Sequence, residues 1–218
     1  MKKLILYTAG SGSREILVSI RDSNRHRPEW EPVAFVDDDP AKIGSTIDGL
    51  PVHGPAQEFG PDMHAICGTM NPIVRKRMSE ELIEARGQRL ATIIHHGALV
   101  ADDLVHGPGL VLMPGVKVNF DIRFGKGVHI LWNCMLGHGL RVADYATLLT
   151  NVTVLADCSV GYAASVGSGS VLSPGARVED GALVGVGTTL LRRVEAGESI
   201  MSMPRIVKWK RKPEAVAH

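Results

Sequence analysis

Apolar residues recur at every sixth position through the second half of the chain. Counting in sixes from Ile94 to Leu190 gives seventeen positions, and sixteen of them are apolar, with His106 as the exception. A helix would repeat near 3.6 residues and an ordinary strand near two, so neither explains a strict period of six. A hexapeptide period is typical of a parallel β-helix, in which each six residues form one short strand and its corner.

A second column of mostly apolar residues follows the first by four positions along the chain and predicts how the coils pack. Its members are mostly small or short-branched, as a crowded corner requires: Ala98, Leu104, Leu110, Val116, Ile122, Val128, Cys134, Leu140, Ala146, Val152, Cys158, Ala164, Ser170, Ala176, Ala182, Thr188 and Val194. Three six-residue faces would close one triangular coil of about eighteen residues. Residues eighteen apart should therefore lie on neighbouring coils, about 4.8 Å from each other.

The first ninety residues follow a different pattern, in which apolar strands alternate with amphipathic helices. The pattern predicts strands within residues 2–7, 31–39, 64–69 and 90–95, and helices within 8–23 and 71–87. Pro72 stands near the start of the second helix and Gly87 at its end, which are the usual positions of these residues. Alternation of strand and helix indicates a small parallel α/β sheet. We therefore divide the chain into an α/β domain, residues 1–91, and a β-helix domain with a C-terminal tail, residues 92–218.

Composition and charge narrow the possible partners. The 218 residues carry a formal net charge of +1, so no strong field attracts nucleic acid or an anionic membrane. The apolar runs are shorter than the roughly 18 residues of a membrane span, and the N-terminal run is too short for a signal peptide. We therefore expect a cytoplasmic protein without a membrane segment. The three cysteines cannot all pair and form no CxxC motif, which favours free buried thiols.

A glycine-rich turn precedes the first predicted helix. It consists of Gly10, Ser11, Gly12 and Ser13. Backbone N–H groups at a helix N-terminus, together with the helix dipole, can hold a phosphate. Asp37 and Asp38 end the second predicted strand, where a carboxylate could meet ribose hydroxyls or a base. The alternative is a tight turn beside a solvated acidic loop.

These motifs together resemble the sialic-acid O-acetyltransferase type of protein, which includes UDP-4-amino-sugar and perosamine N-acetyltransferases. The resemblance rests on TAGSGSREI, FVDDD, CGTMNPIVRKR, TIIHHGALV and SMPRIVKWK, and it covers nearly the whole chain. It implies a Rossmann-like domain that holds a sugar nucleotide, followed by a left-handed β-helix. Acetyl-CoA would lie along the β-helix between subunits of a homotrimer. The implied activity is acetyl transfer to a nucleotide-linked amino sugar, a precursor of surface polysaccharide or glycan.

The resemblance also implies roles for single residues. Besides the glycine-rich turn, Asp37 and Asp38, it assigns Gly68 and Arg75 to the substrate. To acyl-CoA it assigns Ala156, Ser168, Pro204 and Arg205. The glycine-rich stretch VGVGTTL adds Val186 and Gly187, because it offers backbone amides at an open edge. In the turn this chain departs from the related sequences, which carry glycine where Thr8 stands and histidine where Gly12 stands.

His138 is the candidate general base. It lies between Gly137 and Gly139, and a spacing of eighteen places it between Phe120 and Ala156 on the neighbouring coils. The phenyl ring could wall one side of the imidazole, while the glycines leave space around it. From spacing alone, a catalytic histidine and a surface histidine on a turn explain the pattern equally well. The resemblance implies that His138 takes the proton of the acceptor, which imidazole can do near neutral pH.

Two departures from the related sequences surround His138. Gly139 follows it where they have an acid that orients the ring, and Thr147 stands where some carry a second histidine. Asp121 and Asp157 lie eighteen residues to either side of Gly139, so either carboxylate could replace the missing acid. Each aspartate could equally be a solvated turn residue or a cap on a neighbouring amide.

Other functions stay open at this point. One is O-acetylation of a sialic-acid-like sugar, and another is a β-helix binding protein that has lost activity. A third is a β-helical carbonic anhydrase, which would bind zinc through histidines on neighbouring coils. No two histidines of the β-helix region differ by a multiple of eighteen: His95, His96, His106, His129 and His138. We therefore predict no zinc site and no metal cofactor.

Overall fold

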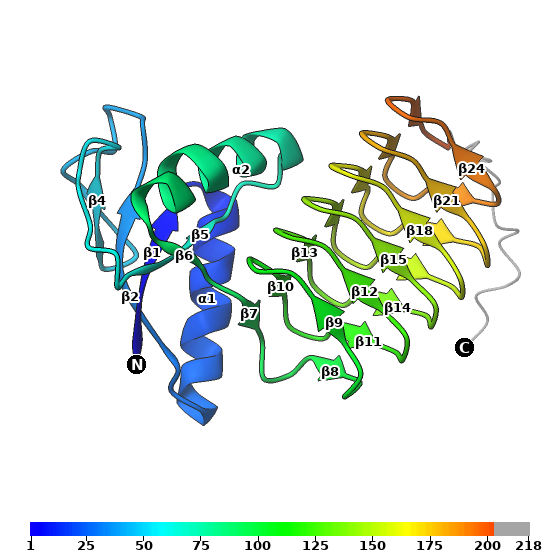
Figure 1. The fold of residues 1–218 in the computed structure, drawn as a ribbon, viewed down its shortest axis with the longest axis horizontal. Coiled ribbons are helices and arrows are strands. Elements are labelled where there is room, and N and C mark those ends of the chain that lie inside the picture. The colour runs from blue at the N-terminus through cyan, green and yellow to red at the C-terminus, as the bar shows by residue number, and fades with distance from the viewer. Residues whose placement is uncertain (203–218) are drawn as a thin grey trace, which may run out of the picture.

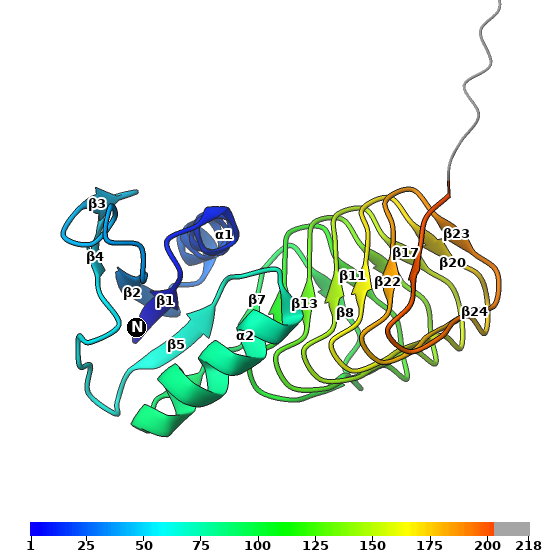
Figure 2. The same ribbon diagram turned by 90° about the horizontal axis from the view of Figure 1, so that it is seen from above.

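The computed structural model describes residues 1–202 and shows an α/β layer joined to a long coil of short strands (Figures 1 and 2). The first part is a six-stranded sheet in the order β3-β4-β2-β1-β5-β6, parallel except for the antiparallel pair β3–β4. Its strands are β1 (Lys2–Tyr7), β2 (Trp30–Val36), β3 (Thr46–Ile47), β4 (Leu50–His53), β5 (His64–Cys67) and β6 (Arg89–Leu90). Its helices are α1 (Ser11–His26) and α2 (Pro72–Met78).

Strand β1 is the centre of this sheet and is covered on both sides. Leu4 and Leu6 belong to the cluster that packs against α1, and Ile5 and Tyr7 belong to the cluster that contains Ile83. A parallel strand buried on both faces reads as a continuous apolar run, which is why the stretch after the two N-terminal lysines carries no polar alternation.

Three details of this part differ from the sequence prediction. The helix predicted within 71–87 is α-helical only in α2, and it continues as a π-helical turn (Ser79–Ile83) and a 3₁₀ turn (Glu84–Arg86). The strand predicted within 90–95 is two strands in different sheets, β6 and β7 (Ile93–Ile94). The hairpin β3–β4 was not predicted, although its Asp48-Gly49 turn, with both φ angles positive, is a recognised hairpin signal.

The second part is a parallel β-helix with three faces. The first face contains β7, β10 (Val111–Leu112), β13 (His129–Ile130), β16 (Thr147–Leu148), β19 (Ser165–Val166), β22 (Leu183–Val184) and β25 (Ser199–Ile200). The second face contains β8 (Leu99–Val100), β11 (Lys117–Val118), β14 (Met135–Leu136), β17 (Thr153–Val154), β20 (Val171–Leu172) and β23 (Thr189–Leu190). The third face contains β9 (Val105–His106), β12 (Arg123–Phe124), β15 (Arg141–Val142), β18 (Ser159–Val160), β21 (Arg177–Val178) and β24 (Arg193–Val194).

The predicted coil of eighteen residues is confirmed over most of the β-helix. Leu112 pairs with Ile130, and Ile130 pairs with Leu148, each eighteen residues further along the chain. From Leu110 onward both columns point into one continuous core, where Leu136 and Leu140 are almost fully buried. In the first coil, at the open end, Ile94 and His106 are exposed. The pattern repeats because every six-residue segment needs an inward side chain of suitable size at the same two places.

The last coil is two residues shorter than predicted. Leu172 still pairs with Leu190 at a separation of eighteen, but Val178 pairs with Val194 at a separation of sixteen. Val194 was placed in the second column by counting, and that placement is wrong because the lost residues move it into the first. Ile200 follows the same shift.

The N-terminal part covers the beginning of the first face. Ile93, Val111, His129 and Thr147, which point outward from four successive coils, are all buried. Ile93 and Val111 share a core cluster with residues of α1 and β1. The second and third faces carry no such cover among the described residues.

The chemistry of the core agrees with the expectations from composition. Cys67, Cys134 and Cys158 are buried and free, and burial raises the pKa of the Cys67 and Cys134 thiols to about 11. Within residues 1–202, the helices are too short or too polar to cross a bilayer.

Candidate active site

His138 lies at the corner between the second and third faces, after β14 and before β15. Its imidazole is half-buried and stacks flat on the ring of Phe120, with ring centroids 5.1 Å apart and an interplanar angle of 2°. Phe120 is one coil earlier, as the spacing of eighteen predicts. The phenyl ring therefore shields one face of the imidazole and leaves the edge with its nitrogens accessible.

Gly139 is glycine for two structural reasons. Its φ angle is 73°, in the left-handed region that favours glycine, and a side chain there would overlap the Oδ1 atom of Asp157. The backbone N–H of Asp157 donates to the carbonyl of His138 at 2.9 Å, so the two residues are neighbours across coils. The acid missing at 139 leaves the space that the carboxylate of Asp157 occupies.

Asp121 has a different environment. Its Oδ1 accepts a hydrogen bond from Nη2 of Arg141 at 2.8 Å, and its carbonyl accepts from Nη1 of the same arginine at 2.6 Å. Asp157 has no ion pair among the described residues. Neither carboxylate is hydrogen-bonded to His138 in this part of the chain, so the choice between them rests on their neighbours. Those neighbours favour Asp157.

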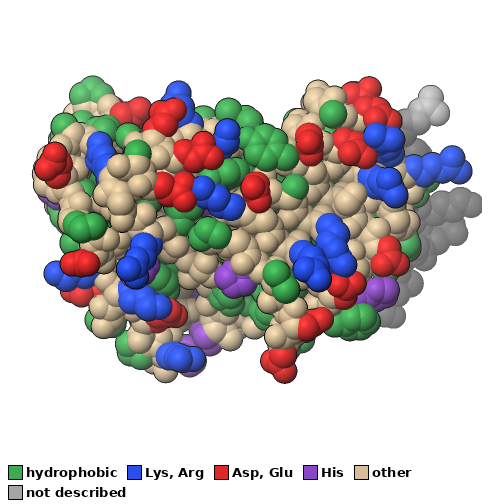
Figure 3. All heavy atoms as spheres, in the orientation of Figure 1, with side chains coloured by type: hydrophobic (Ala, Val, Ile, Leu, Met, Phe, Trp, Pro, Cys, Tyr) green, Lys and Arg blue, Asp and Glu red, His purple; other side chains and the backbone are tan. Residues whose placement is uncertain are grey.

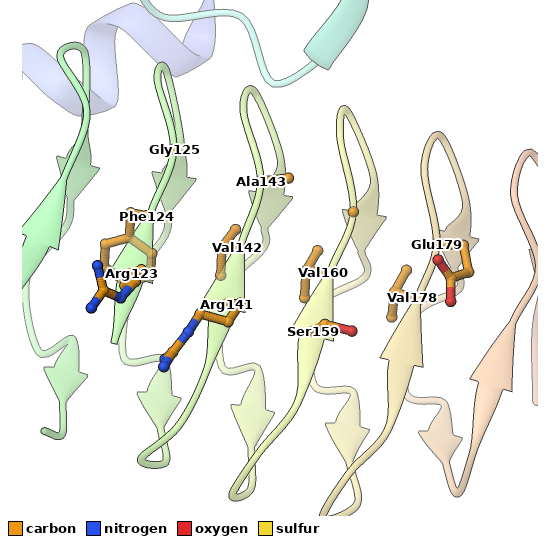
Figure 4. A pocket seen from close by; sticks show the side chains of 11 residues that line it. Arg123, Phe124, Gly125, Arg141, Val142, Ala143, Ser159, Val160, Val178 and Glu179 are labelled. Atoms are coloured by element: carbon orange, nitrogen blue, oxygen red, sulfur yellow. The ribbon is translucent and has the colours of Figure 1, made fainter. Parts of the chain in front are cut away.

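Two open hollows lie on the second and third faces, which meet at the His138 corner, and neither is lined by His138 itself. One, of about 430 Å³, lies on the second face and is lined by Leu99, Lys117 and Met135 among others. The other, also of about 430 Å³, lies on the third face between Arg141 and Glu179 (Figure 4). The corner thus projects between an apolar surface and a charged one.

The residues predicted to bind acyl-CoA border the two edges of the second face. Ala156 is at the same corner as His138, one coil further on. Ser168, Val186 and Gly187 lie at the opposite edge, where the carbonyl of Ser168 accepts the N–H of Gly187 at 2.9 Å. The other two residues of this prediction, Pro204 and Arg205, lie outside the described residues.

A separate pocket of about 310 Å³ lies where β1 and β2 end. Thr8, Asp37, Asp38 and Arg77 all line it. Thr8 has a φ of 72°, a strained conformation for a β-branched residue, at the position where the related sequences carry glycine. Arg77 was not predicted as a site residue, although it follows Arg75 by two positions in CGTMNPIVRKR.

The two aspartates of this pocket differ in their partners. Asp37 is buried and accepts the N–H groups of Ala9 at 2.6 Å and Asp39 at 2.9 Å, with Lys42 Nζ 3.2 Å away. Burial opposes ionisation of the Asp37 carboxyl, but these two N–H groups and Lys42 outweigh it and lower its pKa. Asp37 therefore fixes the loop, whereas Asp38 is exposed and free to meet a ligand.

The glycine-rich turn is packed tightly on one side and open on the other. A side chain at Gly12 would overlap the carbonyl oxygen of Gly68, and one at Gly68 would overlap Ser13. Ser13 is fully buried, and its hydroxyl donates to the carbonyl of Tyr7 at 2.9 Å. Gly10 has open space around it, so a ligand could approach the first helical amides, which have no acceptor within the helix.

Arg75 occupies a different place from the one the resemblance implied. It is 1% exposed and lies between α2 and the β-helix. Its guanidinium donates to the carbonyls of Gly127 at 2.9 Å and Tyr145 at 2.5 Å, and to Oγ1 of Thr147 at 2.8 Å. In this structure Arg75 joins the two parts of the chain. Thr147, where some related sequences have a second histidine, belongs to that junction on the first face.

Comparison with known proteins gives a consistent result. The sequence matches no family model. It is 26% identical over 105 residues to a GDP-perosamine N-acetyltransferase of Escherichia coli O157:H7, which is 48% of this chain and 47% of that protein. The matched stretch therefore spans about half the length of this relative.

Solved structures match over nearly the full length. The acetyltransferase domain of PglB from Neisseria gonorrhoeae FA1090, solved with acetyl coenzyme A, superposes with a TM-score of 0.82 at 20% identity, over 92% of this chain and 96% of that one. PerB from Caulobacter crescentus, solved with CoA and GDP-perosamine, gives 0.81 at 22% identity, over 95% and 97%. WeeI from Acinetobacter baumannii AYE gives 0.73 at 21% identity, over 91% and 96%. The chain therefore shares the fold of these bacterial proteins, two of which are an acetyltransferase domain and a perosamine N-acetyltransferase.

Proposed function

We propose that the protein is an acetyl-CoA-dependent N-acetyltransferase that acts on a nucleotide-linked amino sugar. The observation that carries the proposal is the imidazole of His138, stacked on Phe120 at an open corner of the β-helix. Support comes from the shared fold, because PglB was solved with acetyl coenzyme A and PerB with CoA and GDP-perosamine. A Rossmann-like nucleotide domain and a left-handed coil are part of the proposal.

The chemistry needs one base and one group that orients it. His138 removes a proton from the amino group while the nitrogen attacks the thioester carbonyl. The new C–N bond forms, the C–S bond breaks, and the proton on the imidazole returns to the departing sulfur. A backbone N–H stabilises the charge that develops on the carbonyl oxygen. In the reacting complex the imidazole turns toward Asp157, whose carboxylate then accepts from one ring nitrogen and leaves the other nitrogen free to take the proton.

The acyl donor is proposed to lie along the second face. Its exposed residues include Leu99 and Met135, which are 69% and 48% exposed. Such an apolar strip, with Ala156 and Ser168 at its two edges, suits the pantetheine arm of CoA. His138 lies at the corner where the second face meets the charged third face. A donor on the second face would therefore reach the base at that corner.

A homotrimer would complete this site. The first face is covered by the N-terminal part, which leaves two different faces free on each chain. A cyclic trimer uses two different surfaces of every subunit, so the second and third faces fit that arrangement. The His138 corner would then be enclosed between subunits. Light scattering should give about three times the 23.4 kDa of one chain. A fully active monomer would contradict the interfacial site.

The nucleotide is proposed to bind in the pocket at the ends of β1 and β2. Arg77 and the N-terminus of α1 offer positive charge to phosphates, and Asp38 offers an acceptor to ribose hydroxyls or a base. Asp38→Asn should raise the KM for the sugar nucleotide and leave the KM for acetyl-CoA unchanged. Asp62→Asn, an exposed aspartate elsewhere in this domain, is the matched control.

Thiol release from acetyl-CoA, measured with a panel of nucleotide-linked amino sugars and sialic-acid-like sugars, tests the proposed function. We expect release with at least one amino sugar and a product whose acetyl group is on nitrogen by mass spectrometry. Acetylation of a hydroxyl group would instead establish the O-acetyltransferase. Binding of a sugar nucleotide without any thiol release would show a β-helix binding protein.

A further inference from the structure

Three histidines and an aspartate gather where α1 meets the first coil of the β-helix. Asp22 and His26 are four residues apart on α1, and His95 and His96 follow β7. One potential ligand atom from each of Asp22, His95 and His96 lies within 4.8 Å of the others. The ring centroid of His96 is 3.9 Å from that of His26 and 4.2 Å from that of His95. Figure 3 shows histidine side chains exposed near the C-terminal end of α1.

His95 is held in one protonation pattern by its neighbours. Its Nδ1 accepts the backbone N–H of Gly97 at 3.0 Å, so the ring proton resides on Nε2. That nitrogen lies 3.1 Å from Oδ2 of Asp22 and donates to it. Because both nitrogens are engaged, His95 holds the Asp22 carboxylate in place and keeps no lone pair for another ligand.

The other two histidines are exposed and available. His96 is tied to α1 through its backbone N–H, which donates to Ser23 Oγ at 3.0 Å, and its Nδ1 lies 3.4 Å from the same oxygen. Its ring is exposed to solvent along one edge although it contacts the rings of His26 and His95. His26 lies one helical turn after Asp22, and side chains four residues apart share one face of a helix. Two exposed imidazoles beside a fixed carboxylate form a ligand set that suits zinc and similar divalent metals.

We propose that Asp22, His26 and His96 bind a divalent transition metal, with zinc as the probe, and that His95 positions the Asp22 carboxylate. The ion would bridge α1 to the first coil, between segments about seventy residues apart in sequence. The stack of His26 on His96 must open so that each ring can turn a nitrogen toward the Asp22 carboxylate. Arg25, whose Nη1 is 3.3 Å from Asp22 Oδ1, must also move aside. These movements cost little because the arginine and both imidazoles are exposed. A neighbouring pocket of about 490 Å³, lined in part by His95 and His96, gives the ion a path of entry.

This site is separate from the acetyl-transfer reaction. It lies on the first coil, whereas His138 is at a corner of the third coil, between other faces. The spacing rule of eighteen could not find it, because two of its ligands come from α1 rather than from the β-helix. The prediction of no zinc site considered only histidines that would stack on neighbouring coils, and it did not consider histidines on a helix.

Zinc titration of the full-length, tag-free protein tests the proposal. After treatment with a chelator, calorimetry should show one zinc ion bound per chain. Zinc at about 100 times its Kd should raise the melting temperature by about 5–10 °C. His26→Ala and His96→Ala should each weaken zinc binding at least about tenfold. His106→Ala, an exposed histidine on the same coil, is the matched control and should bind as the wild type does.

The positioning role of His95 has its own readout. His95→Gln keeps an N–H that can reach Asp22 and should retain most of the zinc affinity, whereas His95→Ala should lose at least about tenfold. The melting temperatures of the exposed variants His26→Ala and His96→Ala in chelator should match the wild type, which excludes a folding defect. Wild-type protein that binds no more zinc than the double variant of His26 and His96 would overturn the proposal. Equal loss in His106→Ala would overturn it as well.

Discussion

Replacing Arg75 with leucine removes the charged group at the junction of the two parts of the chain. The guanidinium is buried and makes hydrogen bonds to four backbone carbonyls and one hydroxyl. Burial lowers its pKa to about 10, so it remains charged at neutral pH. Leucine would remove the donor from these acceptors, of which the Ala146 carbonyl alone keeps another, the backbone N–H of His129 at 3.1 Å. Breaking a buried charged network costs about 3–5 kcal/mol, and for a chain of this size that corresponds to a melting temperature about 6–20 °C lower.

Thermal unfolding monitored by circular dichroism measures this loss. The matched control is Arg77→Leu, two residues further along α2, where the side chain is exposed. The control should change the free energy of unfolding by less than about 0.5 kcal/mol and instead raise the KM for the sugar nucleotide. An Arg75→Leu variant that melts like the wild type and alters only the KM for that substrate would refute the structural role of Arg75. In that case the arginine contacts the substrate, as the resemblance implied.

Three further substitutions test the turn and the corner. Gly12→Val should lower the free energy of unfolding by about 1–3 kcal/mol, because its side chain would overlap the carbonyl of Gly68; an unchanged melting curve would show that this packing is loose. Asp157→Asn should lower kcat about 10–100-fold with both KM values unchanged, and should add little to the loss in His138→Ala; full kcat would exclude Asp157 as the orienting group. Gly139→Asp alone should impair activity, and combining it with Asp157→Gly should restore part of it; no recovery in the double variant would argue against exchange of the carboxylate between these positions.

The β-helix could be predicted in detail because its constraint repeats. Each six-residue repeat requires the same two inward positions, so seventeen repeats support one period. The stack of His138 on Phe120 follows from that period directly. A local signal was also present for the hairpin at Asp48-Gly49, and it was overlooked rather than absent. The coil, the stack and the hairpin turn all depend on the order and spacing of residues along the chain, which the sequence shows directly.

Other features depend on contacts that no pattern displays. The last coil has two residues fewer between β23 and β24. Apolar residues occur on both sides of this place, so the sequence there carries no local signal of the shortening. The role of Arg75 depends on which carbonyls of the β-helix lie beneath α2. The cluster around Asp22 and His96 unites a helix with a turn about seventy residues later. These contacts are set by how the two parts of the chain pack against each other.

The kcat of His138→Ala tests the central claim most directly. The ring is half-buried and makes no side-chain hydrogen bond among the described residues, so the variant should fold and melt much like the wild type. With acetyl-CoA and the best amino-sugar nucleotide of the panel, kcat should fall by about 10²–10⁴-fold, while both KM values change little. A His138→Ala enzyme that retains the wild-type kcat would contradict the assignment of His138 as the general base.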